Sequence, residues 1–285
     1  MYAWEMKKLG RADVTIKTYV DKIKTIAKRC NILDPEQVRT YIATANQKNN
    51  SKNALADIFN GFYQFNKIKW LAPIYQAEQP LPFIPTEKEI DEIISATSIN
   101  ISALLELLKE TGCRTVEAIK LEWKDINTEQ KAVNITGAKG SNSRTLPIKE
   151  KLIGMLNHLP KENNKVFQST TGQLRRNWER QRKRIAQKLN NPRITQIHFH
   201  TLRHWKGTME YHKTKDIIHV KTILGHKNIE STMIYINLEQ ALFLEQNDQW
   251  TVKVSHNITE STQLLEAGFE YITDQEGLKL YRKRK

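Results

Sequence analysis

The residues best suited to chemistry lie within positions 198–237. His200 and Arg203 are three positions apart, a Leu-Gly-His corner ends at His226, and Tyr235 follows nine residues later. A tyrosine hydroxyl can attack a phosphodiester if a base accepts its proton and fixed positive charge neutralises the phosphate oxygens. These residue types therefore indicate cleavage of a phosphodiester without a metal ion.

Guanidinium groups suit such a phosphate because they are planar, always charged and able to bind two oxygens at once. Arg114 and Arg203 are the candidates, and each is expected to open a short helix whose free N–H groups attract an anion. A tyrosine has an ordinary pKa near ~10, so it needs a base such as His200, one helical turn from Arg203. Departure of a 5′ hydroxyl needs an acid, which Lys139 could provide.

The segment before residue 73 has the hydrophobic spacing of amphipathic helices. Asp34-Pro35 is typical of a helix start. Pro73, Pro80 and Pro82, with Pro85, stiffen the chain that follows. We therefore expect a small helical domain at 1–72 and an extended linker at 73–85.

The next domain is predicted to combine helices with a β-hairpin. Thr86-x-x-Glu89 is a capping-box pattern that opens the first helix. Alternating apolar residues on both sides of the loop at 137–143 predict a hairpin with Lys139 near its tip. An apolar helix at 217–224 should end at Gly225 and place His226 at its C-terminus. The fold class is therefore mainly α with a small β component (α+β), with a second domain at 86–250 and a small β/α tail at 251–285.

Composition indicates a nucleic-acid partner inside the cell. The net charge is +14 and the pI near 9.6, as expected of a protein that binds a polyanion. There is no apolar run of 18 residues and no signal-peptide pattern, so we expect no membrane association. Two distant cysteines fit a reducing cytoplasm. One helix around 174–189 is rich in positive charge and is expected to contact DNA through Arg175, Arg176, Arg180, Arg182, Lys183 and Arg184.

Four stretches together are similar to known motifs. They are TGCRTVEAIKLEW around Arg114, AKGSNSRTLPI around Lys139, HTLRH around Arg203, and LGHKNIESTMIYIN, which contains His226 and Tyr235. The chain thereby resembles the tyrosine recombinase (phage integrase) family, most closely the integrases of archaea and mobile elements. The resemblance covers about residues 85–237, and the N-terminal helices resemble the core-binding domain of the family more loosely.

The resemblance implies a site-specific DNA recombinase or integrase that clamps double-stranded DNA and forms a covalent 3′-phosphotyrosyl intermediate. It also implies strand exchange through a Holliday junction in a homotetramer, without a metal or nucleotide cofactor. Glu117 matches a supporting acidic position. The implied catalytic roles are phosphate binding by Arg114 and Arg203, proton donation by Lys139, proton acceptance or shuttling by His200, hydrogen bonding to the phosphate by His226, and nucleophilic attack by Tyr235.

Some alternatives stay open. The hairpin has Ala-Lys-Gly where Gly-Lys-Gly is frequent in the family, so Arg144 and Lys149 are weaker candidates for the acid. Tyr211 is the next candidate nucleophile. The tail extends past the usual end of the family, and our hypothesis is that it docks on a neighbouring subunit. The competing functions are a type IB-like topoisomerase, a non-catalytic DNA-binding protein, and a metal enzyme built on His198, His200, His204, His212 and His219.

Overall fold

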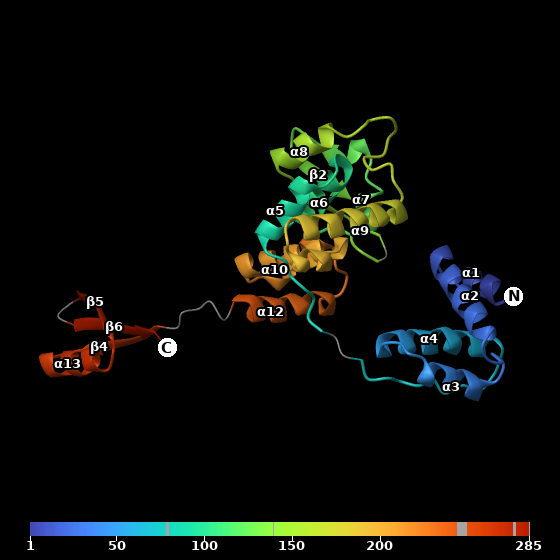
Figure 1. Cartoon of the computed structure of the whole chain (residues 1–285), viewed down its shortest axis with the longest axis horizontal. Helices are drawn as coiled ribbons and strands as arrows, with labels where there is room; N and C mark the ends of the chain where they lie inside the picture. The colour runs from blue at the N-terminus through green and yellow to red at the C-terminus, as the bar shows by residue number, and fades with distance from the viewer. Residues whose placement is uncertain (78–79, 139, 244–249, 276–277, 285) are drawn as a thin grey trace. The chain divides into compact units, whose positions relative to one another are not determined.

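The computed structural model of the protein (Figure 1) describes residues 1–77, 80–138, 140–243, 250–275 and 278–284. The chain divides into two compact units, Met1–Pro80 and Leu81–Lys285. The mainly helical α+β fold expected from the sequence is confirmed. Among the described residues, no helix combines the length and the apolar character needed to cross a membrane.

The N-terminal unit consists of helices that pack around one core. Asp34 begins α3 as expected, because its Oδ1 accepts hydrogen bonds from the backbone N–H groups of Glu36 (2.9 Å) and Gln37 (3.3 Å). Phe59 and Tyr63 are fully buried at the centre of the core. The helices are α1 (Tyr2–Lys8), α2 (Asp13–Ala27), α3 (Pro35–Thr44) and α4 (Asn49–Phe65).

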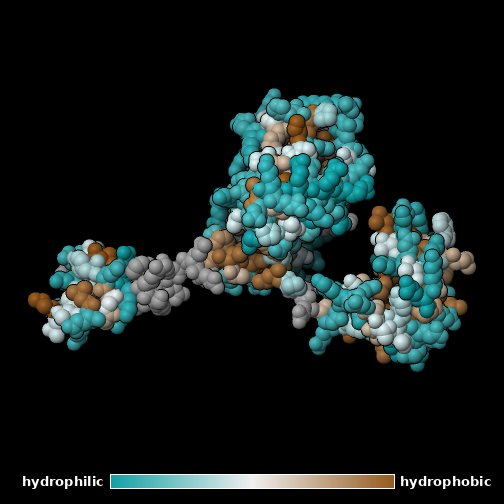
Figure 2. Space-filling model, in the orientation of Figure 1, coloured by the Kyte–Doolittle hydropathy of each residue, from teal (hydrophilic) through white to brown (hydrophobic). Residues whose placement is uncertain are grey.

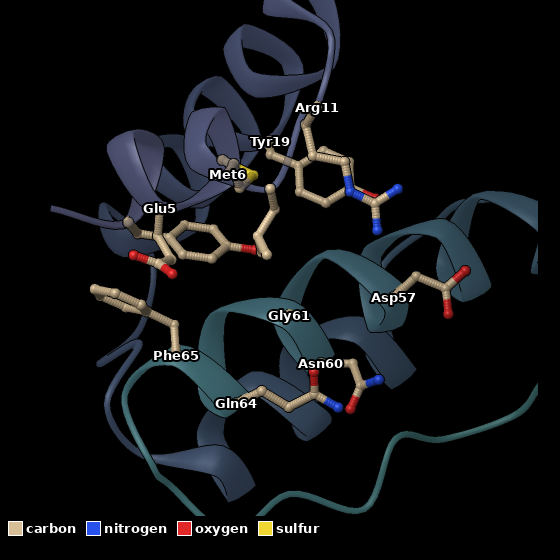
Figure 3. A pocket seen from close by; sticks show the side chains of 11 residues that line it. Glu5, Met6, Arg11, Tyr19, Asp57, Asn60, Gly61, Gln64 and Phe65 are labelled. Atoms are coloured by element: carbon tan, nitrogen blue, oxygen red, sulfur yellow. The ribbon is translucent and has the colours of Figure 1, made fainter.

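A groove of about 750 Å³ opens on this unit, lined by residues of α1, α2 and α4 and by the turn before α2 (Figure 3). The hydroxyl of Tyr2 lies against Gly61, where a Cβ atom would approach it to 2.7 Å. Glu5, Asp57 and Gln64 give the groove a polar rim. The residues found lining it include none of those with an expected catalytic role.

The segment after α4 is held to the N-terminal unit by side chains. The amide of Asn53 exchanges two hydrogen bonds of 2.8 Å with the backbone of Tyr75. Arg39 donates to the carbonyl of Leu71 at 3.1 Å. Further along, Ile84 is buried in the core of the second unit.

The second unit is built around α6, whose leucines are buried on all sides. It contacts α5, α8, α9 and α10. Thr86 and Glu89 form the predicted capping box at the start of α5. The helices of this unit up to residue 243 are α5 (Glu87–Ala96), α6 (Ile99–Thr111), α7 (Thr115–Ala118), α8 (Glu150–Asn157), α9 (Thr171–Lys188), α10 (Phe199–Thr214), α11 (Ile217–Leu224) and α12 (Glu230–Phe243), with 3₁₀ turns at Trp123–Asp125 and Pro192–Gln196.

The predicted hairpin is confirmed as β2 (Ala132–Ile135) and β3 (Arg144–Pro147), which pair antiparallel with Val133 opposite Leu146. A third strand that the sequence did not predict, β1 (Ile126–Asn127), pairs with β2. The sheet order is β1-β2-β3. The inward-facing residues Val133 and Leu146 join the core of the helices, as does Ile135, the last residue of β2 before the loop to β3.

The tail forms a small sheet and one helix. Strands β4 (Trp250–Ser255), β5 (Glu270–Gln275) and β6 (Leu278–Arg284) are antiparallel in the order β4-β6-β5, and α13 spans Ile258–Glu266. The buried hydroxyl groups of Ser255 and Ser261 are 2.8 Å apart and link β4 to α13. A β/α tail was expected from the sequence, and these are its elements.

The visible face of the second unit is mostly hydrophilic, with an apolar area where α12 lies (Figure 2). Met233 and Leu242 of α12 are both exposed. The side of this helix that carries Tyr235 and Leu238 is buried. That buried side packs against α10 and contributes to the candidate active site.

Candidate active site

Arg114 stands at the start of α7, where Gly112 ends α6 in the left-handed conformation (φ +61°). Its guanidinium lies 3.3 Å from Oε1 of Glu117, which is only 1% exposed. The other oxygen of Glu117 accepts from the Arg114 backbone (3.0 Å) and from Arg144 (2.9 Å). Burial alone would raise the pKa of Glu117, but these hydrogen bonds and the Arg144 charge lower it, so the carboxylate is ionised.

Arg203 is buried (1% exposed) and connects three segments of the unit. It donates to the carbonyls of Gly112 (2.7 Å) and Leu224 (2.8 Å), the last residue of α11. Burial and the charge of Arg114 lower its pKa to about 10, so it remains charged at neutral pH. One expectation was wrong: Arg203 does not open a short helix but lies in the second turn of the 16-residue α10.

His200 and His226 lie in the field of these arginines. Burial, then Arg203 and Arg114, lower the pKa of His200. The same causes, joined by Arg144, lower the pKa of His226 to about 3. His226 follows Gly225, which ends α11 as predicted (φ +69°). Both imidazoles are therefore neutral at pH 7, and a neutral imidazole can accept a proton or donate one hydrogen bond.

Tyr235 of α12 is enclosed in the same cluster and is 1% exposed. Its ring stacks on that of His226, with centroids 6.4 Å apart and planes 8° apart. Burial raises the pKa of Tyr235 to about 12, although Arg203 and Arg114 act in the opposite direction. The phenol is therefore protonated at neutral pH and needs a base before it can attack.

Three residues to which sequence reasoning gave no role in this site lie next to Tyr235 or His226. A Cβ at Gly207 of α10 would lie 2.5–2.8 Å from three ring carbons of Tyr235. Thr232 is fully buried and lies 2.9 Å from Nδ1 of His226. The ring of His204 is 6.1 Å from that of Tyr235. A glycine inside a predicted helix was the available signal for Gly207, since glycine there needs a packing reason.

The candidates for the proton donor and the alternative nucleophile lie in different parts of the unit. Lys139 lies outside the described residues, but Ala138 donates to Glu117 (3.4 Å) and Ser141 donates to the carbonyl of Gly225 (2.9 Å). Arg144, a weaker candidate for the acid, is paired with Glu117 and nearly buried. Two further residues lie elsewhere: Lys149 immediately precedes α8, and Tyr211 lies toward the C-terminal end of α10.

The basic residues of helix α9 are of two kinds, buried and exposed. Arg182 is 7% exposed and donates to the carbonyl of Ile197 (2.8 Å), with His198 at the same distance, so it is not part of the exposed surface. The exposed residues among those expected to contact DNA are Arg175, Arg176, Arg180, Lys183 and Arg184. Arg175 among them pairs with Glu179 (3.0 Å).

The histidines that suggested a metal have other neighbours. His212 contacts Glu239 at 2.9 Å, and His219 lies 3.5 Å from Glu210. His200 meets His204 edge to face, with ring centroids 4.8 Å apart. Within the described part of the chain, no three His, Cys, Asp or Glu side chains form a group that could hold a metal ion.

Several known proteins are similar to this chain. Residues 85–241, more than half of the chain, match the model of the phage integrase family. The tyrosine recombinase XerC of Proteus mirabilis is 24% identical over 79% of this chain and 84% of its own length. A probable integrase/recombinase of Methanocaldococcus jannaschii, MJ0367, is 28% identical over 54% of this chain and 50% of its own.

A solved structure shares the fold. The XerH site-specific recombinase, bound to its palindromic difH substrate after cleavage, superposes with a TM-score of 0.61 at 20% identity, covering 82% of this chain and 79% of that one. A helical unit with two arginines, two histidines and a buried tyrosine defines the class of enzyme. The chain belongs to the phage integrase family and is a site-specific recombinase of the tyrosine type.

Proposed function

We propose that the protein cuts and rejoins double-stranded DNA at specific sites through a covalent 3′-phosphotyrosyl intermediate. One observation carries the proposal: the phenol of Tyr235 is enclosed with the charges of Arg114 and Arg203 and the neutral imidazoles of His200 and His226. This is the set of groups that a tyrosine nucleophile needs to attack a phosphodiester at neutral pH.

In the first step, Arg114 and Arg203 bind the nonbridging oxygens of the scissile phosphate and His226 donates a hydrogen bond to one of them. Arg203 is held by two backbone carbonyls, so its position does not have to be organised during the reaction. His200, or a water that it holds, accepts the phenol proton. The Tyr235 oxygen then attacks phosphorus.

As the new P–O bond forms, the bond between phosphorus and the 5′ oxygen breaks, and that oxygen needs a proton. We assign this donation to Lys139 on the strength of its motif, because Ala138 and Ser141 on either side contact Glu117 and Gly225. Attack by a 5′ hydroxyl on the phosphotyrosine reverses every step. No external energy source is needed, because one phosphoester is exchanged for another.

DNA binding is assigned to the exposed basic residues of α9 and to the N-terminal unit at residues 1–72, which together with the catalytic domain at 86–250 would clamp the duplex. The net charge of +14 supports a polyanion partner. Each phosphate contact releases counterions, so binding should weaken steeply as salt rises. Arg182 is left out of this assignment because it is buried.

Recombination of two duplexes requires four strands to be cut, and each subunit has one Tyr235. We therefore propose a homotetramer on DNA that exchanges strands in two rounds through a Holliday junction. An oligonucleotide containing the target site is obtained by selecting bound sequences from DNA that flanks the gene.

The test uses that oligonucleotide with a nick close to the scissile phosphate, so that the cleaved fragment diffuses away and the adduct accumulates. Wild-type protein should become covalently linked to DNA, and Tyr235→Phe should bind DNA equally well without forming the adduct. Tyr211→Phe is the matched control and should behave like wild type. An adduct that persists in Tyr235→Phe and disappears in Tyr211→Phe would place the nucleophile on α10 and overturn the proposal.

A second assay separates recombination from topoisomerase activity. Two labelled duplexes with the target site are incubated with wild-type protein, and a supercoiled plasmid is tested in parallel. Recombinant products containing both labels support site-specific recombination. Relaxation of the plasmid without such products would instead support the type IB-like alternative.

A further inference from the structure

A charged contact lies on α12 one helical turn beyond Tyr235. Glu239 is 8% exposed, and its Oε1 accepts hydrogen bonds from Nδ1 of His212 (2.9 Å) and from the ammonium group of Lys215. Both partners are at the C-terminal end of α10, where Lys215 ends the helix in the left-handed conformation. The two hydrogen bonds lower the pKa of Glu239, so the carboxylate is ionised at neutral pH.

The same end of α10 makes an aromatic contact with α12. The His212 ring stacks on Phe243, the last residue of α12, with centroids 3.7 Å apart and planes 21° apart. His212 therefore contacts α12 at two places one turn apart. We call Glu239, His212, Lys215 and Phe243 the α12 latch.

A second attachment lies on the other side of the tyrosine. Thr232, three residues before Tyr235, is fully buried and lies 2.9 Å from Nδ1 of His226, in the segment after α11. Between the two attachments, the Tyr235 ring rests on Gly207 of α10. The nucleophile is thus held from both ends of its helical segment by residues of its own chain.

We infer that Tyr235 attacks the phosphate bound by its own subunit, and that Glu239, with His212 and Lys215, is the positioning residue that keeps it there. This inference rests on the proposed function and adds to it which active site each nucleophile enters. Glu239 does not touch the reacting atoms. It acts through the position of α12, and the bonds made and broken are those already given.

The latch can be tested without DNA. Hydrogen exchange of the α12 backbone amides reports how often the helix leaves its site. Glu239→Gln keeps the size of the side chain but removes the charge, so exchange between residues 232 and 243 should be at least about tenfold faster, since hydrogen bonds to charged groups are the stronger ones. Glu230→Gln makes the same change at an exposed position of the same helix and should leave exchange unchanged.

Adduct formation on the nicked substrate gives the second readout. Glu239→Gln and Lys215→Gln should each form the adduct about tenfold more slowly at unchanged DNA affinity. The double variant should be no slower than the slower single one, because both remove the same contact. Lys215 is largely exposed, so its variant tests the latch with little risk to folding.

A mixing experiment tests which subunit supplies the tyrosine. Arg114→Gln retains Tyr235 but loses part of the phosphate site, and Tyr235→Phe retains the phosphate site but lacks the hydroxyl. If each tyrosine serves its own site, the mixture should form no more adduct than Arg114→Gln alone. Strong adduct formation in the mixture would show attack across subunits and overturn the inference.

The outcomes separate the two proposals. Unchanged exchange and unchanged adduct rates in both latch variants would overturn the role of Glu239 even if wild-type protein recombines DNA. Absence of any adduct with wild-type protein on its selected site would overturn the proposed function, and with it the assignment of each tyrosine to its own site. Faster exchange, slower adduct formation and an inactive mixture together support the inference.

Discussion

Gly207 is the point where the ring of Tyr235 meets the backbone of α10. A Cβ atom there would lie 2.5 Å from Cζ, 2.6 Å from Cε1 and 2.8 Å from Cε2 of the ring, whereas ordinary contact begins at 3.4 Å. The ring is also buried and stacked on His226, so it cannot simply rotate away. Gly207→Ala must therefore displace the nucleophile.

The displacement needed is about 1 Å, and a misplacement of that size can cost on the order of 100-fold in rate. Overpacking of a core costs about 1–3 kcal/mol. Alanine in place of glycine in a helix offsets about 1 kcal/mol of this. We therefore expect Gly207→Ala to remain folded, with a loss of at most about 2 kcal/mol, and to form the covalent adduct about 100-fold more slowly.

The measurement compares three quantities: adduct rate on the nicked substrate, DNA affinity and the free energy of unfolding in urea. Gly154→Ala is the matched control, because it makes the same change inside α8, where nothing lies within 4 Å of the added Cβ. That control should keep wild-type activity and gain up to about 1 kcal/mol in stability. An adduct rate within threefold of wild type in Gly207→Ala would refute the reasoning, because the position of the Tyr235 ring would then not depend on its contact with α10.

Three further predictions concern buried titratable groups. Glu117→Gln breaks a buried pair with two arginines and should cost about 3–5 kcal/mol in urea unfolding; a loss below about 1 kcal/mol contradicts this. Burial and the nearby arginines lower the pKa of His200, so its base form persists in acid and adduct formation should become half-maximal below pH 6.5; a midpoint above pH 6.5 argues against it. Burial would raise the pKa of Glu89, but hydrogen bonds, chiefly from Arg193, lower it to about 2. Glu89 should therefore contribute about 3 kcal/mol to the free energy of unfolding above pH 4.5, and this contribution should be lost as the pH falls toward 2. Arg193→Ala should make the free energy of unfolding depend less on pH over this range.

Elements defined by local chemistry could be predicted from the sequence. Asp34 and the pair Thr86–Glu89 satisfy free N–H groups at helix starts, and both act as expected. Gly225 ends α11 because only glycine adopts a positive φ without strain. The hairpin followed from alternating apolar residues, with Val133 paired to Leu146.

Features that depend on distant partners were missed. In the sequence, Arg182 looks like one more exposed positive charge of the helix. It nevertheless lies on the buried side of α9, at helical spacing from Leu174 and Trp178. Its guanidinium contacts the carbonyl of Ile197 and the imidazole of His198, both in the segment before α10. Arg203 was expected at a helix start, but α10 already begins at Phe199. Strand β1 has only two residues, too few for a periodic pattern.

The sequence alone determined the chemical inventory and the family, because a tyrosine, two arginines and two histidines with their neighbours form motifs that can be read locally. The tertiary structure decided the protonation states and the packing of these residues. Burial and the nearby arginines keep His226 neutral, and burial keeps Tyr235 protonated although the arginines act in the opposite direction. Only packing shows that Tyr235 rests on Gly207. These properties arise from desolvation and through-space contacts between residues far apart in the chain, which no local pattern encodes.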